Sequence, residues 1–183
     1  MSQMFSEINK INNVWTPALG SSGAAGAAPG TTNASYETDI LNMSLYKHAT
    51  FVITAGAIVE CNHMNVKVMA CVSATEGGYT VPIDFYYRAQ GSTETAAYAS
   101  SGDKPGTLTA GTSDGFDTSS GGVGAIYIVE VDTPNILAEG ATYEHVKLYI
   151  QGSTQDDDPR NYSILAILSE PRYPQAVLNT AID

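Results

Sequence analysis

Two strand-like apolar runs lie on either side of a polar turn within residues 143–173, and they form the clearest pattern in the chain. In the first run Val146, Leu148 and Ile150 alternate with polar or amphipathic residues, which is the period of a strand with one face on a core. The second run, residues 162–168, is apolar on both sides, which predicts a strand covered on both faces. We expect the two runs to form a hairpin.

Further runs of strand-forming residues predict strands at 50–55, 66–73, 83–88 and 125–131. Glycines and Pro82 separate these runs, and no helix longer than a turn or two fits between them. Successive strands without helical crossovers pair mostly antiparallel. The fold class that we predict is therefore all-β, as an antiparallel β-sandwich or jelly roll rather than an α/β plan.

The N-terminal residues show a different spacing. Residues 2–15 predict a short helical arm, with Ser2 as a cap, because apolar residues recur every three or four positions, at Met4, Phe5, Ile8, Ile11 and Trp15. A linker rich in glycine and alanine follows at 18–35. Either the arm is a frayed terminus or its apolar face docks on a neighbouring subunit. In both cases we expect deletion of residues 1–30 to leave thermal unfolding nearly unchanged.

A second segment of small and polar residues covers 91–122. Loops of this length without secondary structure are uncommon in compact domains. Either residues 108–116 add a short hairpin or edge strand, or the segment is a surface excursion that becomes ordered against a partner. The predicted organisation is an arm with a flexible linker at 1–35, a β-sandwich domain at 36–173 and a tail at 174–183.

Composition and charge narrow the classes of partner. The chain has 183 residues, of which 43% are hydrophobic, enough for one well-packed domain. Its 19 acidic and 8 basic residues give a net charge of -11, which disfavours nucleic acid as a partner. The sequence has neither an apolar run of about 20 residues nor the pattern of a signal peptide, so we expect no membrane partner and synthesis in a cytoplasm. Cys61 and Cys71 are too few for a disulfide framework and are predicted to be free thiols, with Cys71 on a sheet.

A search for catalytic and metal-binding patterns gives no candidate site. The nearest approach to a nucleophile and base is Cys61 with His63, whose polar neighbours indicate a connection, and the glycine runs have no helix start behind them that would bind phosphate. His48, His63 and His145 lack the paired spacing of zinc ligands. Residues 156–158 are three aspartates without the spacing of an EF-hand, which favours a solvated turn over a calcium site. We therefore predict no catalytic, cofactor-binding or metal-binding residues, no cofactor and no enzymatic activity.

The predicted strands are rich in aromatic residues, most of them tyrosines. Tyrosine packs a ring while its hydroxyl stays hydrated, so a core or subunit interface is the favoured interpretation. An aromatic platform for sugars is the alternative. The residues concerned are Tyr79, Phe85, Tyr86, Tyr87, Tyr127, Tyr143, Tyr149, Tyr162 and Tyr173.

The order of these segments resembles a family of small virion structural proteins of tailed bacteriophages, over residues 39–173. The resemblance rests on strand patterns rather than on catalytic motifs. It begins with an acidic and apolar lead-in at 39–43 and ends on a turn that is similar to one in the family, Glu170-Pro171-Arg172-Tyr173. The matching segments are YKHATFVITAGAI, VKVMACVSA, PIDFYYR, AIYIVEVDTPNI, YEHVKLYIQG and ILAILSEPRYP.

The resemblance implies a β-sandwich and a role as a capsid decoration or cement protein on the capsid surface of the virion. Its partners would be the major capsid protein or other virion proteins, and repeated copies would gain affinity through multivalent contact. A homo-oligomer is expected, with a trimer favoured at the threefold junctions of a shell. Two alternatives stay open: a phage tail or head–tail joining protein, and a carbohydrate-binding β-sandwich module.

Overall fold

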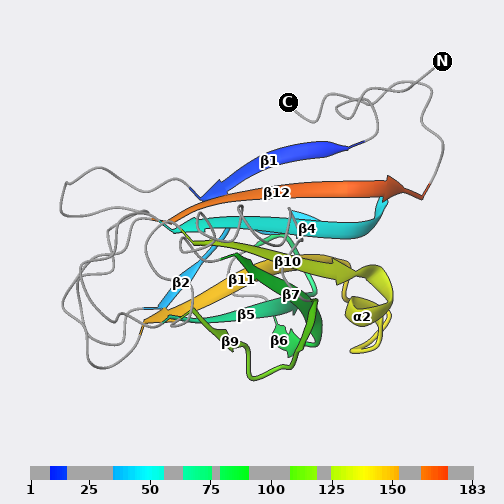
Figure 1. Ribbon diagram of the computed structural model, residues 1–183. Coiled ribbons are helices and arrows are strands. Elements are labelled where there is room, and N and C mark those ends of the chain that lie inside the picture. The colour runs from blue at the N-terminus through cyan, green and yellow to red at the C-terminus, as the bar shows by residue number, and fades with distance from the viewer. Residues whose placement is uncertain are drawn as a thin grey trace, which may run out of the picture.

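Two antiparallel β-sheets make up most of the chain that the computed structural model describes, namely residues 9–15, 35–55, 64–75, 79–90, 108–118, 125–152 and 162–172 (Figure 1). Sheet A has the strand order β1 (Lys10–Trp15), β12 (Tyr162–Pro171), β4 (Tyr46–Ala55), β10 (Ile126–Asp132), β7 (Phe85–Gln90) and β8 (Thr109–Gly111). Sheet B has the order β2 (Ser35–Glu37), β11 (His145–Gly152), β5 (Met64–Cys71) and β6 (Thr80–Ile83), while β3 (Leu41–Asn42) also pairs with β11 and β9 (Phe116–Asp117) with β5. A short helix, α2 (Thr133–Leu137), follows β10. The all-β prediction is confirmed.

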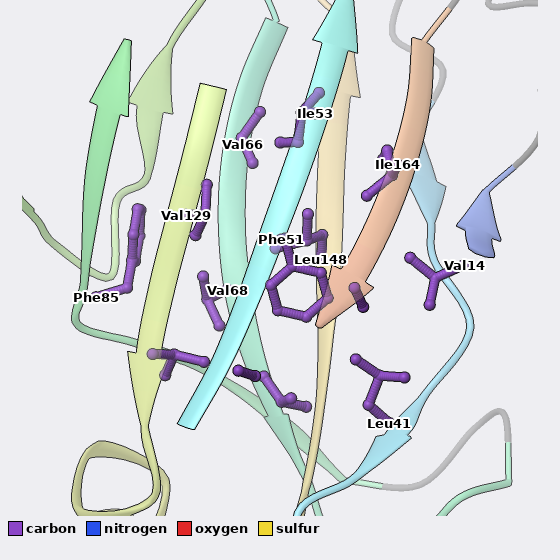
Figure 2. Packing of buried hydrophobic residues seen from close by; sticks show 14 of the residues in the cluster. Val14, Leu41, Phe51, Ile53, Val66, Val68, Phe85, Val129, Leu148 and Ile164 are labelled. Atoms are coloured by element: carbon purple, nitrogen blue, oxygen red, sulfur yellow. The ribbon is translucent and has the colours of Figure 1, made fainter. Parts of the chain in front are cut away.

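One hydrophobic core lies between the two sheets. Each long strand points every second side chain toward the opposite sheet, because successive side chains of a strand point to opposite faces. Val146, Leu148 and Ile150 of β11 are at most 4% exposed, which confirms the inward face predicted for them. Figure 2 shows the two inner faces meeting, with Phe51, Ile53, Val129 and Ile164 from sheet A and Val66, Val68 and Leu148 from sheet B.

The predicted hairpin between the two C-terminal runs is wrong. β11 lies in sheet B, paired with β5 on one side and with β2 and β3 on the other. β12 lies in sheet A between β1 and β4. Both edges of each strand are thus occupied by other strands. The chain crosses from one sheet to the other between β11 and β12.

The strand predicted at 83–88 is divided between the two sheets. β6 pairs with β5 in sheet B, whereas β7 pairs with β10 in sheet A, so the chain changes sheets at Asp84. The Asp84 carboxylate accepts a hydrogen bond from the Ser113 backbone N–H at 3.1 Å, and its carbonyl accepts one from Asn135 at 3.0 Å. These contacts hold the crossing point against the β8–β9 turn and α2.

The chain crosses between sheets again after β8. β8 pairs with β7 in sheet A and β9 pairs with β5 in sheet B, and a four-residue turn ending at Gly115 connects them. Gly115 has φ of 84°, and a Cβ there would lie 2.6 Å from the Val66 carbonyl oxygen, so the turn requires glycine. The edge-strand interpretation is therefore confirmed for Thr109–Gly111. Residues 91–107 and 119–122 of the long segment lie outside the described part.

The N-terminal helix prediction is wrong for Lys10–Trp15, which form strand β1 at the edge of sheet A; residues 1–8 lie outside the described part. Ile11 and Val14 would share one face of a helix, but in β1 they lie on opposite faces, with Val14 4% exposed and Ile11 50% exposed. A short isolated helix is marginal, whereas the backbone edge of β12 supplies hydrogen-bond partners for a strand. Part of the predicted arm is thus a strand of the domain, while the boundaries predicted near 35 and 173 stay predictions.

The end of β12 is tied to the start of β4. Glu170 adopts a left-handed backbone conformation with φ of 54°. The backbone N–H of Arg172 then donates to the Leu45 carbonyl at 2.8 Å, and its guanidinium Nε donates to the Tyr46 carbonyl at 3.3 Å. Arg172 therefore fastens the end of β12 to the residues that begin β4.

Candidate contact surface

The outer face of sheet A carries a group of six aliphatic side chains that nothing in the described chain fully covers. They come from β1, β12, β4 and β10, at the positions between the inward-facing core residues. Ile11 is 50% and Leu165 is 40% exposed, and the others are partly buried. We call this group the outer stripe: Ile11, Val52, Ile126, Ile128, Leu165 and Ile167.

Strand register makes these side chains neighbours. Ile11 lies opposite Ile167 across β1 and β12. In the next row Leu165 lies opposite Val52, and Val52 lies opposite Ile128. Directly opposed Cβ atoms of an antiparallel pair are about 4.5–5.5 Å apart, so the stripe is a continuous apolar surface across four strands.

The outer stripe is a candidate site for contact with another molecule. Burying apolar surface gains about 25 cal/mol per Å², and contiguous apolar patches on soluble proteins often mark interaction sites. The sequence suggested a different interpretation, since Leu165 and Ile167 predicted a strand covered on both faces. With Leu165 at 40% exposure, that prediction is wrong for the described chain.

A polar cluster borders the stripe at one end of β4. His48 Nδ1 lies 2.6 Å from Asp132 Oδ1, and His48 Nε2 lies 3.1 Å from the Thr50 hydroxyl. Glu130 Oε1 is 3.9 Å from the same Nε2. The order hydroxyl, imidazole and carboxylate is that of a nucleophilic triad, so this cluster is the strongest catalytic candidate in the described residues.

Its surroundings do not support catalysis. His48 and Thr50 lie on β4, whose backbone groups pair with β12 on one side and β10 on the other. The N–H groups beside Thr50 are thus engaged in the sheet, whereas acyl transfer needs free donors aimed at the developing oxyanion. Two open cavities of about 460 and 500 Å³ lie elsewhere, and His48 lines neither. We interpret the cluster as an oriented polar border of the stripe.

The outer face of sheet B carries an ion pair between a buried lysine and a partly exposed glutamate. Lys147 is 3% exposed, and its Nζ lies 2.6 Å from Glu37 Oε2 on β2. A buried ammonium is costly unless it is paired, so this contact ties β2 to β11 beyond their backbone ladder. The two sheets therefore differ in chemistry on their outer faces.

Cys71 lies beside this ion pair and is a free, buried thiol, which confirms the prediction that it lies on a sheet as a free cysteine. Burial raises the pKa of the thiol from 9.0 to about 11; nearby Lys147 lowers it and Glu37 raises it, each by a smaller amount. Because the thiolate is the nucleophile, Cys71 is unreactive at neutral pH.

In a Cys61→Ser background, we expect iodoacetamide to alkylate Cys71 of the native protein at pH 8 at least 100-fold more slowly than an unfolded thiol. A pKa of about 11 instead of 9.0 lowers the thiolate fraction at that pH by about 100-fold. The rate should rise with pH toward 11. The same protein in denaturant is the control, and equal rates in both states would contradict the assignment.

Because the pKa of Cys71 is raised in the folded protein, the stability that the protonated thiol contributes is complete below pH 9 and is lost as the pH rises toward 11.

The described tyrosines do not converge on a sugar-binding groove. Tyr87 stacks on Phe116 with ring centroids 4.2 Å apart, and Tyr127 is 1% exposed in the core. Tyr79 and Tyr86 are exposed, but Tyr79 precedes β6 of sheet B, Tyr86 lies on β7 of sheet A, and neither lines a cavity. The core interpretation holds for Tyr87 and Tyr127, while Tyr173 lies outside the described part.

The remaining candidates from the sequence are not brought together. His48 is on β4 of sheet A and His145 is on β11 of sheet B. Cys61, His63 and residues 156–158 lie outside the described part. Among the described residues, no group of three or more His, Cys, Asp or Glu side chains is arranged to hold a metal ion. No helix in the same residues has the length and apolarity to span a membrane.

Comparison of the sequence with protein-family models gave no match, and a search of the curated proteins gave no significant match.

Proposed function

We propose that this protein is a non-enzymatic virion structural protein that binds and stabilises a phage capsid, as a decoration or cement protein on the capsid surface. In this proposal the two sheets form a β-sandwich, with the single core between them as its support. The phage-like order of the strand sequences is the second support. The domain would act through contact rather than through chemistry.

The outer stripe is the observation that carries the proposal. A structural protein needs a surface that gains free energy when covered, and the stripe supplies one on the rigid frame of four paired strands. The core of a protein interface is depleted of charged residues, with polar groups at the rim. The stripe has this composition, with His48, Glu130 and Asp132 at its border.

Charge favours a shell surface over the packaged genome. The net charge of -11 opposes binding to nucleic acid. Repetition of the shell lattice would compensate for a modest contact area, because linked copies bind at high effective concentration. We propose a homo-oligomer, with a trimer favoured at a threefold junction, and the major capsid protein as partner.

We expect the purified protein to co-sediment with mature shells that lack it, up to a saturating number of copies set by the lattice. Leu165→Asp should weaken this binding by at least tenfold, because it places a charge in the centre of the stripe. The matched control is Gln151→Asp, which adds the same charge at an exposed position of sheet B. Shells that carry the protein should also resist heat better, since a ligand of the assembled state stabilises that state.

Two results would contradict the proposal. One is absence of binding to mature shells at micromolar concentration together with localisation to the tail, which would favour a tail or head–tail joining protein. The other is equal binding by the Leu165→Asp and Gln151→Asp variants, which would exclude the stripe as the contact.

A further inference from the structure

Among the described strands, β1 has a backbone ladder with one neighbour only. It lies at the edge of sheet A and pairs with β12, from Lys10 opposite Leu168 to Trp15 opposite Ile164. On its other side, the Val14 carbonyl accepts one hydrogen bond from the Asp39 N–H, at 3.3 Å. Among the side chains described in β1, Val14 alone is buried. Opening of this strand therefore exposes much less apolar surface than unfolding of the domain.

The sequence between β1 and β2 is long compared with ordinary connections. Residues 16–34 are rich in glycine, alanine and serine. At about 3.3–3.6 Å per residue, a chain of this length can reach about 65 Å when fully extended. Connections between elements of compact domains are usually about four to six residues. The spacing thus lets β1 reach a second copy without disturbing the rest of its own sheet.

We propose that β1 exchanges between copies of the chain, so that β1 of one copy pairs with β12 of another. The exchanged pair makes the same contacts as the pair within one chain, because both strands have the same sequence. The protein concentration then decides whether β1 pairs with β12 of its own chain or with β12 of another copy. Closure within one chain competes at an effective concentration in the millimolar range, so exchange is expected where copies reach similar local concentrations.

Exchange also changes the composition of the outer stripe. Ile11, its most exposed member, belongs to β1 and lies opposite Ile167 of β12. In an exchanged assembly each stripe is therefore built from two copies of the chain. The inference concerns free copies and is independent of what the stripe binds.

The test uses a disulfide that can form only between copies. Asn13 lies opposite Leu165, and both are exposed on the outer face of sheet A. A tagged copy with Asn13→Cys is mixed with an untagged copy with Leu165→Cys, each in a Cys61→Ser, Cys71→Ala background, at about 1 mM. The mixture is oxidised with glutathione, either directly or after the two copies are refolded together. Non-reducing electrophoresis and mass spectrometry then measure the 13–165 heterodimer.

We expect a heterodimer yield at least tenfold above that of a matched control with Ile11→Cys in place of Asn13→Cys. Ile11 is on the same strand and face but about 7 Å further along, beyond the reach of a disulfide to position 165. The yield of the heterodimer should fall at about 10 μM, where pairing of β1 with β12 of the same chain is favoured. A yield equal to the control after joint refolding at 1 mM would overturn the proposal. Failure of one chain carrying both cysteines to form the internal disulfide would also overturn it, since the proposal needs this register.

Discussion

Replacing Ile150 by Asp is expected to unfold the domain, so that the protein is recovered mostly in the insoluble fraction. Ile150 is 4% exposed in the core and lies opposite Val66 on β5 and Tyr36 on β2. A carboxylate at this position would be buried without a cation, at a cost of several kcal/mol. Typical domains are stable by about 5–15 kcal/mol, so this loss removes most of the margin.

The control for this experiment is the next residue in the chain. Gln151 is exposed, because adjacent residues of β11 point to opposite sides of sheet B. Gln151→Asp adds the same side chain and should leave solubility and the melting temperature within a few degrees of the parent protein. A soluble Ile150→Asp variant with an unchanged melting temperature would contradict the placement of β11.

Deleting residues 1–15 is expected to lower the melting temperature by about 6–12 °C, contrary to the expectation from the sequence that the N-terminal segment is dispensable. The deletion removes β1, its ladder with β12 and the burial of Val14. Ladder hydrogen bonds contribute about 0.5–1.5 kcal/mol each, and burial of a valine about 1.5–3 kcal/mol. After the entropy of ordering the strand is subtracted, we expect a net loss of roughly 3 kcal/mol, at about 2–4 °C per kcal/mol.

Two point variants separate the strand from the rest of the segment. Val14→Ala should reproduce part of the loss, because Val14 is 4% exposed, whereas Ile11→Ala should have a smaller effect, because Ile11 is 50% exposed. Calorimetry of the deletion and the two variants measures each contribution. A melting temperature unchanged by the deletion would show that β1 contributes nothing to stability.

The positions of most strands were predictable from local pattern. Strands with one face on the core repeat their buried residues at every second position, and the runs around Phe51, Val68, Val129 and Leu148 keep that period. The exclusion of a long helix followed from the same spacing. Composition and charge likewise need no structure, so the expectation that nucleic acid is a poor partner rests on the sequence alone.

Strand partners were not predictable, because pairing depends on which backbone edges stay free once the other strands are in place. The sequence pattern predicted a hairpin of β11 and β12. In the structure β11 lies in sheet B and β12 in sheet A, and both edges of each strand pair with other strands. Residues 83–88 read as one strand, yet Asp84 divides them between sheets through contacts with Ser113 and Asn135, which are distant in sequence.

The strand conformation of β1 was likewise not predictable from its own residues. The spacing of Ile8, Ile11 and Trp15 in the sequence fits one face of a helix, and no local signal decides against it. The edge of β12 that pairs with β1 decides the matter, because its backbone ladder stabilises a strand, whereas a short isolated helix is only marginally stable in water.

The candidate contact surface was predictable from the sequence only in part. Leu165 and Ile167 were visible as apolar residues in the sequence, but a run that is apolar on both sides has the same pattern whether its second face is covered or open. Coverage depends on a further layer of structure, which the described chain does not place over sheet A. The sequence by itself therefore determined the all-β class, the inward faces and the acidic charge. Only the tertiary structure decided strand partners, the identity of β1 and the exposure of the outer stripe, because each depends on residues far apart in the chain.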